Sequence, residues 1–207
     1  MVTGLPSVAL YFRTKVYYAG SRRTCRLKER MLLTSNHCCF YDPIIVASVF
    51  WTSQMHFLAT TTLYHNRFLR WFMPAMHCIE VDKDNFNMRV FREIGDALKR
   101  NCPVLIFPEG TLNSSEGGEN KDMLAFKSGA VLIAHSTRTP ILPIYIVDRK
   151  HWYNRYKIVI GDEIDVNAMC GDRPSMKDIE RVNEVLREKE EELRRYYESV
   201  ACSKKPK

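Results

Sequence analysis

The stretch Ser35-Asn36-His37-Cys38-Cys39-Phe40-Tyr41-Asp42-Pro43 predicts a turn from a buried strand into a helix, and the rest of the sequence is organised around it. The apolar run Met31 to Ser35 is typical of a buried strand that ends at a sheet edge. Asp42 followed by Pro43 predicts a helix start, because an aspartate caps free N–H groups and a proline loses no hydrogen bond at the first helical position. We therefore expect a helix that begins at Pro43 and continues to Trp51.

His37 and Asp42 are candidates for a catalytic pair within this turn. On one continuous helix, two residues five apart would lie on different faces, whereas a strand-loop-helix turn folds the carboxylate back against the imidazole. An imidazole titrates near neutrality, and a carboxylate on its other nitrogen fixes the tautomer and stabilises the imidazolium. The pair is therefore a candidate base for deprotonating an alcohol. The alternative is that Asp42 only caps the helix.

A second strand exit, Phe107-Pro108-Glu109-Gly110-Thr111, follows later in the chain. Together with Asn36-His37-x4-Asp42, this motif resembles the phospholipid and glycerol acyltransferase family, typified by 1-acylglycerol-3-phosphate acyltransferases. Two further segments agree in order: Ala125 to Ala130 is similar to the family's lysine-glycine helix, and Ile141 to Ile144 is similar to its proline-containing strand. The resemblance covers Lys15 to Asp165.

The resemblance implies transfer of a fatty acyl group from a thioester, on coenzyme A or acyl carrier protein, to the free hydroxyl of a lysophospholipid, with 1-acylglycerol-3-phosphate as the expected acceptor. His37 would remove the hydroxyl proton and Asp42 would orient His37, so that the alkoxide attacks the thioester directly. Glu109, Gly110 and Thr111 would hold the glycerol and phosphate of the acceptor. Backbone N–H groups near the start of the expected helix are candidates for stabilising the oxyanion. We expect no bound cofactor and no metal.

The cations that would meet the acceptor's phosphate differ from the family pattern. Lys83 stands where the family has a substrate-binding arginine, and a lysine keeps the charge but lacks the planar fork. Lys127, in the expected helix Met123 to His135, is the other candidate, although both lysines could be solvated surface residues. Leu112 stands where an arginine commonly follows the second motif. A lysolipid with a different headgroup is therefore an alternative acceptor.

Two adjacent cysteines beside His37 suggest rival interpretations. A thiolate of Cys38 or Cys39 could take the acyl group before passing it on, but residues adjacent in sequence usually point apart. A metal site formed by His37 and the two thiols is less favoured. From another class, the chain could be a lipid-binding protein that keeps the fold and lacks turnover, which the intact motif residues argue against.

Composition favours one globular domain. The chain has 207 residues, of which 45% are hydrophobic, enough for one sizeable core over residues 1–202. Residues 203–207 are expected to form a disordered basic tail. The seven cysteines show neither metal spacing nor a disulfide framework, which is typical of a reducing cytoplasm. No apolar stretch is long enough to span a bilayer.

Charge and aromatic residues suggest a membrane surface as partner. The formal net charge is +7, with basic residues concentrated between Arg13 and Arg30, and no motif resembles a nucleic-acid-binding module, so we expect anionic lipid rather than nucleic acid. The expected helix Leu63 to Met73 places four aromatic rings on one face, flanked by Arg67 and Arg70. These rings are Tyr64, Phe68, Trp71 and Phe72. Core packing is the favoured interpretation of the rings, and membrane contact is the alternative. We expect a cytoplasmic protein peripherally associated with the inner face of the cell membrane.

Strands alternate with helices along the whole chain, which predicts an α/β sandwich with a mainly parallel, mixed sheet flanked by helices. The expected strands are Lys15 to Ala19, Met31 to Ser35, Met55 to Ala59, His77 to Val81, Val104 to Phe107, Ile141 to Val147 and Tyr156 to Ile160. A long amphipathic helix is expected over residues 175–200. Its inward residues are predicted to be Ile179, Val182, Leu186, Leu193, Tyr196 and Val200.

Overall fold

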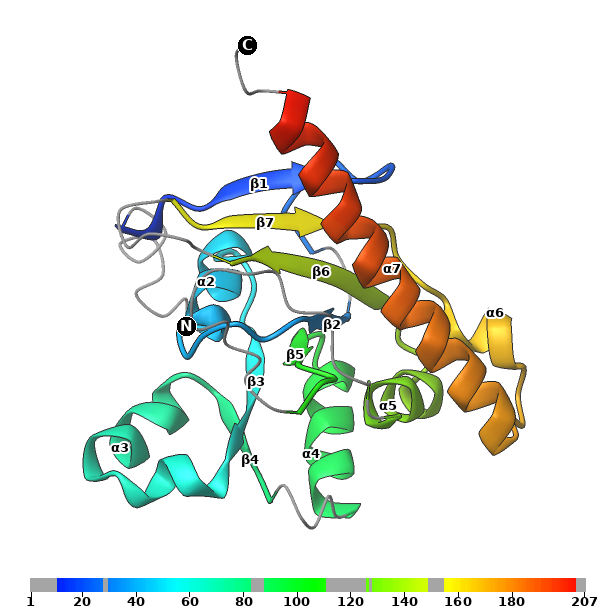
Figure 1. Cartoon of the computed structure of the whole chain (residues 1–207). Helices are drawn as coiled ribbons and strands as arrows, with labels where there is room; N and C mark the ends of the chain where they lie inside the picture. The colour runs from blue at the N-terminus through cyan, green and yellow to red at the C-terminus, as the bar shows by residue number, and fades with distance from the viewer. Residues whose placement is uncertain are drawn as a thin grey trace.

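A mixed seven-stranded sheet forms the centre of the protein (Figure 1). The computed structural model describes residues 11–27, 30–82, 88–110, 126, 128–148 and 155–203. The strands are β1 (Lys15–Tyr18), β2 (Leu32–Ser35), β3 (His56–Thr60), β4 (Cys78–Val81), β5 (Val104–Ile106), β6 (Ile141–Val147) and β7 (Lys157–Ile160). Their order is β1-β7-β6-β2-β5-β3-β4, and every neighbouring pair is parallel except β6 with β7. The prediction of a mainly parallel, mixed α/β sheet is confirmed.

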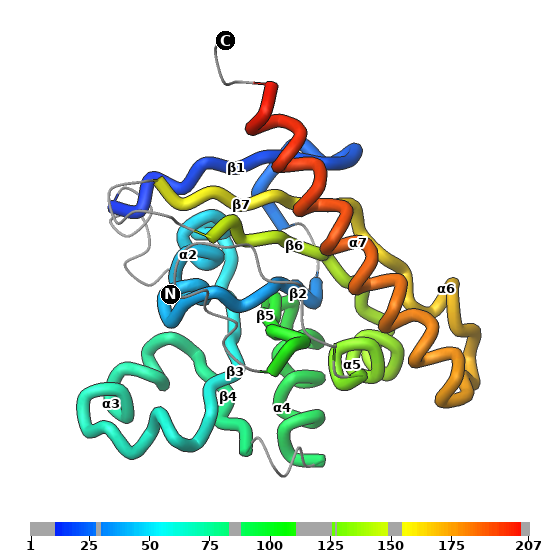
Figure 2. Tube along the Cα trace, in the orientation of Figure 1, coloured from blue at the N-terminus to red at the C-terminus, as the bar shows by residue number. Residues whose placement is uncertain are grey.

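Helices cover both faces of the sheet. They are α2 (Asp42–Val49), the 3₁₀ helix η1 (Thr61–His65), α3 (Arg67–Ala75), α4 (Met88–Lys99), α5 (Gly129–Thr137), α6 (Val166–Cys170) and α7 (Met176–Ser203). One apolar core lies between the sheet and α2, and a second lies between the other face and α4, α5 and α7. The α3 segment lies beyond β3 and β4, at the opposite end of the sheet from β1 (Figure 2).

The central position of β2 explains its composition. It pairs with β5 on one side and β6 on the other, and all four of its residues are buried. Leu32 belongs to the core on the α7 side and Leu33 to the core on the α2 side, as alternation along a strand requires. Thr34 pairs with Ile106 of β5 in parallel register. The two segments that leave these strands, and with them the two sequence motifs, therefore emerge side by side at the carboxyl edge of the sheet, where α/β folds bind ligands.

Two helix boundaries differ from the sequence predictions for local reasons. Helix α2 includes Asp42, with Tyr41 at the N-cap position and no side-chain cap, so the predicted start at Pro43 is one residue late. The expected helix Leu63 to Met73 is divided, because Asn66 is extended and its side chain accepts hydrogen bonds from the first turn of α3. An asparagine cap of this kind starts a new helix and ends the preceding one.

The predicted and observed helices differ more in the second half of the chain. Helix α5 begins at Gly129, and neither Phe126 nor Ser128 is helical, so the predicted start at Met123 is too early. In α7, Tyr196 is exposed and the neighbouring Tyr197 packs against the core instead, which corrects one predicted inward residue. Ser203 belongs to α7, and the rest of the expected tail, residues 204–207, lies outside the described residues.

Candidate active site

A histidine–carboxylate pair lies where β2 ends. The Nδ1 atom of His37 is 3.0 Å from Oδ2 of Asp42. The Asp42 side chain is completely buried, whereas the His37 side chain is 19% exposed. The imidazole therefore has one nitrogen fixed against a buried carboxylate, and no described residue hydrogen-bonds the other nitrogen, Nε2. This is the arrangement that a histidine base requires.

Backbone and thiol groups of the turn fix the carboxylate. The N–H groups of Cys38 and Cys39 donate to Oδ2 of Asp42 at 2.6 and 2.8 Å, and the Cys39 thiol donates to Oδ1 at 3.0 Å. The carboxylate points back into the turn instead of capping α2, which explains why the helix includes Asp42. These bonds occupy the N–H groups of Cys38 and Cys39, which are therefore not available to stabilise an oxyanion.

Asn36 anchors the turn to the neighbouring strand. Its side-chain amide donates to the carbonyl oxygen of Ile146 at 2.9 Å and accepts from the N–H of Ile146 at 2.7 Å. The side chain thus continues the pairing of β2 with β6 by one step beyond the last backbone pair, Ser35 with Ile144. Because Asn36 is buried and bonded at both ends of its amide, His37 leaves the sheet from a fixed point.

The second motif lies directly beside the histidine. The ring of Phe107 stacks on the His37 imidazole, with ring centroids 4.0 Å apart and planes inclined by 15°. Gly110 closes the following turn, donating its N–H to the carbonyl oxygen of Phe107 at 3.0 Å. Its φ of +67° is a conformation that glycine adopts without strain. The Glu109 side chain within this turn is buried.

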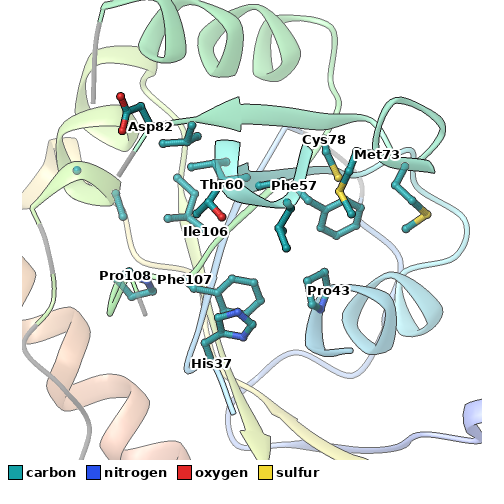
Figure 3. A pocket seen from close by; sticks show the side chains of 18 of the residues that line it. His37, Pro43, Phe57, Thr60, Met73, Cys78, Asp82, Ile106, Phe107 and Pro108 are labelled. Atoms are coloured by element: carbon teal, nitrogen blue, oxygen red, sulfur yellow. The ribbon is translucent and has the colours of Figure 1, made fainter. Parts of the chain in front are cut away.

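A large apolar cavity begins at His37 (Figure 3). Its volume is about 770 Å³, which lies within the usual range for small-molecule sites, roughly 300–1,000 Å³. Phe57 and Thr60 of β3 line it, together with Cys78 of β4 and Ile106 of β5. Figure 3 shows His37 beside Phe107 and opposite these strands. The walls are suited to a hydrocarbon chain whose reacting end reaches the imidazole.

Another part of the cavity wall comes from η1, α3 with its C-terminal end, α4 and α5. The lining residues from these segments are Leu63, Leu69, Phe72, Met73, Met76, Phe91, Leu132 and Ile133. All are apolar, and Met side chains adapt to irregular contents. A base at one end of an apolar cavity is a geometry for chemistry on a lipid.

Comparison with known proteins gives the family. A sequence model of the acyltransferase family matches residues 14–147. The chain belongs to the acyltransferase family. It is 25% identical over 129 residues to the 1-acyl-sn-glycerol-3-phosphate acyltransferase of Streptococcus pneumoniae, covering 62% of this chain and 46% of that protein. It is also 25% identical over 167 residues to the Bacillus subtilis protein of the same name, covering 78% of this chain and 80% of that protein.

A solved structure shares the fold. The 1-acyl-sn-glycerophosphate (LPA) acyltransferase PlsC of Thermotoga maritima superposes with a TM-score of 0.62 and 20% identity, covering 92% of this chain and 79% of that one. The chain thus spans about half the length of the pneumococcal relative and most of the lengths of the other two. The family predicted from the two motifs is confirmed.

The structure describes four of the predicted site residues. It brings His37, Asp42, Glu109 and Gly110 to one edge of the sheet, and His37 and Gly110 both line the cavity. The remaining predicted residues, Thr111, Lys83 and Lys127, lie outside the described residues, as does Leu112.

The two thiols of the turn are held in their protonated form. Burial, and then the charge of Asp42, raise the pKa of Cys38 far above its usual range, and the same causes raise the pKa of Cys39 to about 12. A thiol reacts with a thioester as the thiolate. The surroundings of Cys38 and Cys39 therefore disfavour the covalent route through a cysteine.

Sequence reasoning missed one buried acid near the site. Glu190 of α7 is fully buried, and burial raises its pKa well above the usual range, while the nearby Thr34 hydroxyl lowers it and Glu109 raises it further. A signal was present in the sequence, because Glu190 falls in the apolar stripe formed by Val182, Leu186 and Leu193. A charged residue in such a stripe is unusual, since burial penalises the ionised form.

Proposed function

We propose that this protein transfers a fatty acyl group from a thioester, on coenzyme A or acyl carrier protein, to the free hydroxyl of a lysophospholipid, with 1-acylglycerol-3-phosphate as the acceptor. The observation that carries this proposal is the position of the His37–Asp42 pair at one end of an apolar cavity of about 770 Å³. The names of the relatives support the same acceptor.

His37 acts as the general base in this reaction. The acceptor hydroxyl donates a hydrogen bond to Nε2, the nitrogen that faces away from Asp42. As the oxygen attacks the thioester carbonyl, its proton passes to Nε2 and a tetrahedral intermediate forms. Collapse of the intermediate breaks the carbon–sulfur bond, and the imidazolium returns the proton to the leaving thiolate. The products are the new ester and a free thiol, with no acyl-enzyme intermediate.

Asp42 makes His37 effective in two ways. Its contact with Nδ1 selects the tautomer that leaves Nε2 free to accept a proton, and its negative charge stabilises the imidazolium formed during attack. Phe107 holds the ring from one side by stacking. An imidazole fixed in this way loses little orientational freedom when the acceptor binds.

The acceptor's glycerol phosphate would lie against the second motif. We propose that Glu109, Gly110 and Thr111 contact it, with Lys83 and Lys127 supplying positive charge to the phosphate. An ammonium hydrogen-bonded to phosphate contributes on the order of 1.5–3 kcal/mol, so each Lys→Met substitution should raise KM for lysophosphatidate at least about tenfold. Acceptors without a terminal phosphate should be affected less.

The experiment that tests this proposal compares kcat/KM for lysophosphatidate with that for lysophosphatidylcholine in the wild type, Lys83→Met and Lys127→Met. Wild type should prefer lysophosphatidate, and the preference should fall in both variants. A wild type that prefers lysophosphatidylcholine would contradict the acceptor, and a purified folded protein without turnover on any lysolipid would contradict the enzymatic function. Donor identity is read in the same assay by offering acyl-coenzyme A and acyl carrier protein separately.

A further inference from the structure

Helix α3 has two apolar faces, only one of which is used by the cavity. Leu69, Phe72 and Met73 line the cavity. On the outside of the helix, Phe68 is 68% exposed and Trp71 is 75% exposed. The interpretation of these rings as core residues is therefore wrong for Phe68 and Trp71. Large aromatic rings exposed to water on the outer side of a helix, whose inner side lines a lipid-sized cavity, indicate a contact with an apolar partner.

The charged residues of α3 indicate which kind of partner the exposed rings contact. Arg67 and Arg70 flank the two exposed rings, both are exposed, and neither makes an ion pair with a described residue. The sequence contains no aspartate or glutamate from Pro43 to Ile79, so α3 and the segments that flank it in the chain carry no acidic side chain of their own. We call Arg67, Phe68, Arg70 and Trp71 the α3 outer face. Exposed rings between arginines match a surface that is apolar below and anionic at its headgroups.

The basic segment between Arg13 and Arg30 lies in a different part of the protein from α3. Arg22, at its centre, forms an ion pair with Glu163 at 2.5 Å and also donates to the backbone oxygens of Thr24 and Arg26. Strand β1 lies at the opposite edge of the sheet from β4 and α3 (Figure 2). The two features that the sequence combined into one membrane contact are therefore separated by the whole sheet, and only α3 adjoins the cavity.

We propose that the α3 outer face docks this protein on the surface of an anionic lipid bilayer, with Phe68 and Trp71 inserted among the lipids and Arg67 and Arg70 at the headgroups. The inner side of the same helix then separates the bilayer from the cavity by one helix thickness. Lipid substrate is taken from the surface to which the protein is bound. The proposal deepens the proposed function and rests on it, because it assigns a role to the membrane in delivering substrate to His37.

The rings and the arginines both contribute to membrane binding, and their contributions depend differently on salt concentration. Rings at the interface contribute burial that is independent of salt, whereas the arginines attract anionic lipid and are screened by salt. An arginine near an anionic surface contributes roughly fivefold in partition, so losing two should weaken binding about 25-fold. Losing both rings should weaken it at least about tenfold at any salt concentration.

Vesicle sedimentation separates these contributions. Full-length wild type, Phe68→Ser with Trp71→Ser, and Arg67→Gln with Arg70→Gln are mixed with vesicles of phosphatidylcholine, with or without phosphatidylglycerol. The matched control is Arg173→Gln with Arg195→Gln, two exposed arginines near and within α7. Wild type and control should bind anionic vesicles, the ring variant should lose binding at all salt concentrations, and the arginine variant should lose the salt-dependent part.

Activity links docking to catalysis and keeps the two proposals distinguishable. Both α3 variants should lose turnover of long-chain lysophosphatidate held in vesicles and keep turnover of a short-chain lysophosphatidate dissolved in water. The docking proposal is overturned if the ring variant binds vesicles as the wild type does. It is also overturned if the wild type binds no anionic vesicles, and a dimer that the ring variant dissociates would then identify a second copy of the chain as the partner. Absence of turnover on the dissolved acceptor in the wild type would contradict the proposed function and leave the vesicle result standing.

Discussion

Asp42→Asn tests how the turn supports the histidine. Oδ2 of Asp42 accepts three hydrogen bonds, from Nδ1 of His37 and from the N–H groups of Cys38 and Cys39. An asparagine NH₂ group at the position of Oδ2 would face three donors, so the amide oxygen should occupy that position instead. The NH₂ group would then face the Cys39 thiol, whose sulfur is a weak acceptor. The variant should therefore keep the turn and the tautomer of His37 and lose only the negative charge.

The size of the expected loss of activity follows from that geometry. The charge matters when His37 becomes an imidazolium, and a hydrogen bond to a charged group contributes about 1.5–3 kcal/mol, so kcat/KM should fall about 10- to 150-fold. Asp42→Ala, by contrast, leaves three donors around a completely buried site without an acceptor. Each unsatisfied group costs about 1–3 kcal/mol, so this variant should lose stability as well as activity.

The assay follows release of free thiol from the acyl donor, with thermal unfolding by circular dichroism measured on the same samples. Asp165→Asn is the matched control, because that carboxylate caps the distant α6 and does not line the cavity. Asp42→Asn should unfold near the wild-type temperature and keep a measurable rate. The reasoning is refuted if a folded Asp42→Asn is as inactive as His37→Ala, or if it has the full wild-type rate.

Three further predictions concern neighbouring groups. Asn36→Ala should lower the free energy of unfolding in urea by about 2–4 kcal/mol, because two buried backbone groups of β6 lose their partners; a loss under 1 kcal/mol would argue against the anchor. Cys38→Ala combined with Cys39→Ala should remain active, and intact-protein mass spectrometry of the wild type during turnover should detect no acyl-enzyme; an inactive folded double variant would revive the thiol route. Burial, with the neighbouring His77, lowers the pKa of His56 to about 4 from the usual 6.5, so the unfolded chain takes up this proton first as pH falls. The free energy of unfolding should therefore be highest above about pH 6.5 and fall by about 1–2 kcal/mol towards pH 4. His56→Gln should reduce this loss, and a variant with the same pH profile as the wild type would contradict the prediction.

The sequence predicted the features whose determinants are close together in the chain. Strand β6 was predicted with its observed bounds, because a buried strand is a continuous apolar run. The His37–Asp42 contact was predicted because five residues are enough to form the turn. Asn36 was placed at the strand exit, but its role depends on Ile146, which is 110 positions away and pairs with it only in the folded sheet.

Burial of helix faces was harder to predict. Periodicity indicates that Phe68, Trp71 and Phe72 lie close together on α3, but it cannot indicate which of them the rest of the protein covers. The structure turns Phe72 towards the cavity and leaves Phe68 and Trp71 outside. The start of α5 was also misjudged, since nothing in the local sequence pattern indicates that the helix begins at Gly129 rather than at Met123.

Turnover by wild type and His37→Ala on the same acceptor tests the central claim most directly. The side chain is partly exposed at the end of the cavity, so its removal should leave the fold intact. With lysophosphatidate and an acyl thioester, mass spectrometry should show phosphatidic acid accumulating with wild type, and the rate should fall by about 10²–10⁴-fold in the variant because the base is lost. A folded His37→Ala that forms phosphatidic acid at the wild-type rate would contradict the assignment of His37 as the base.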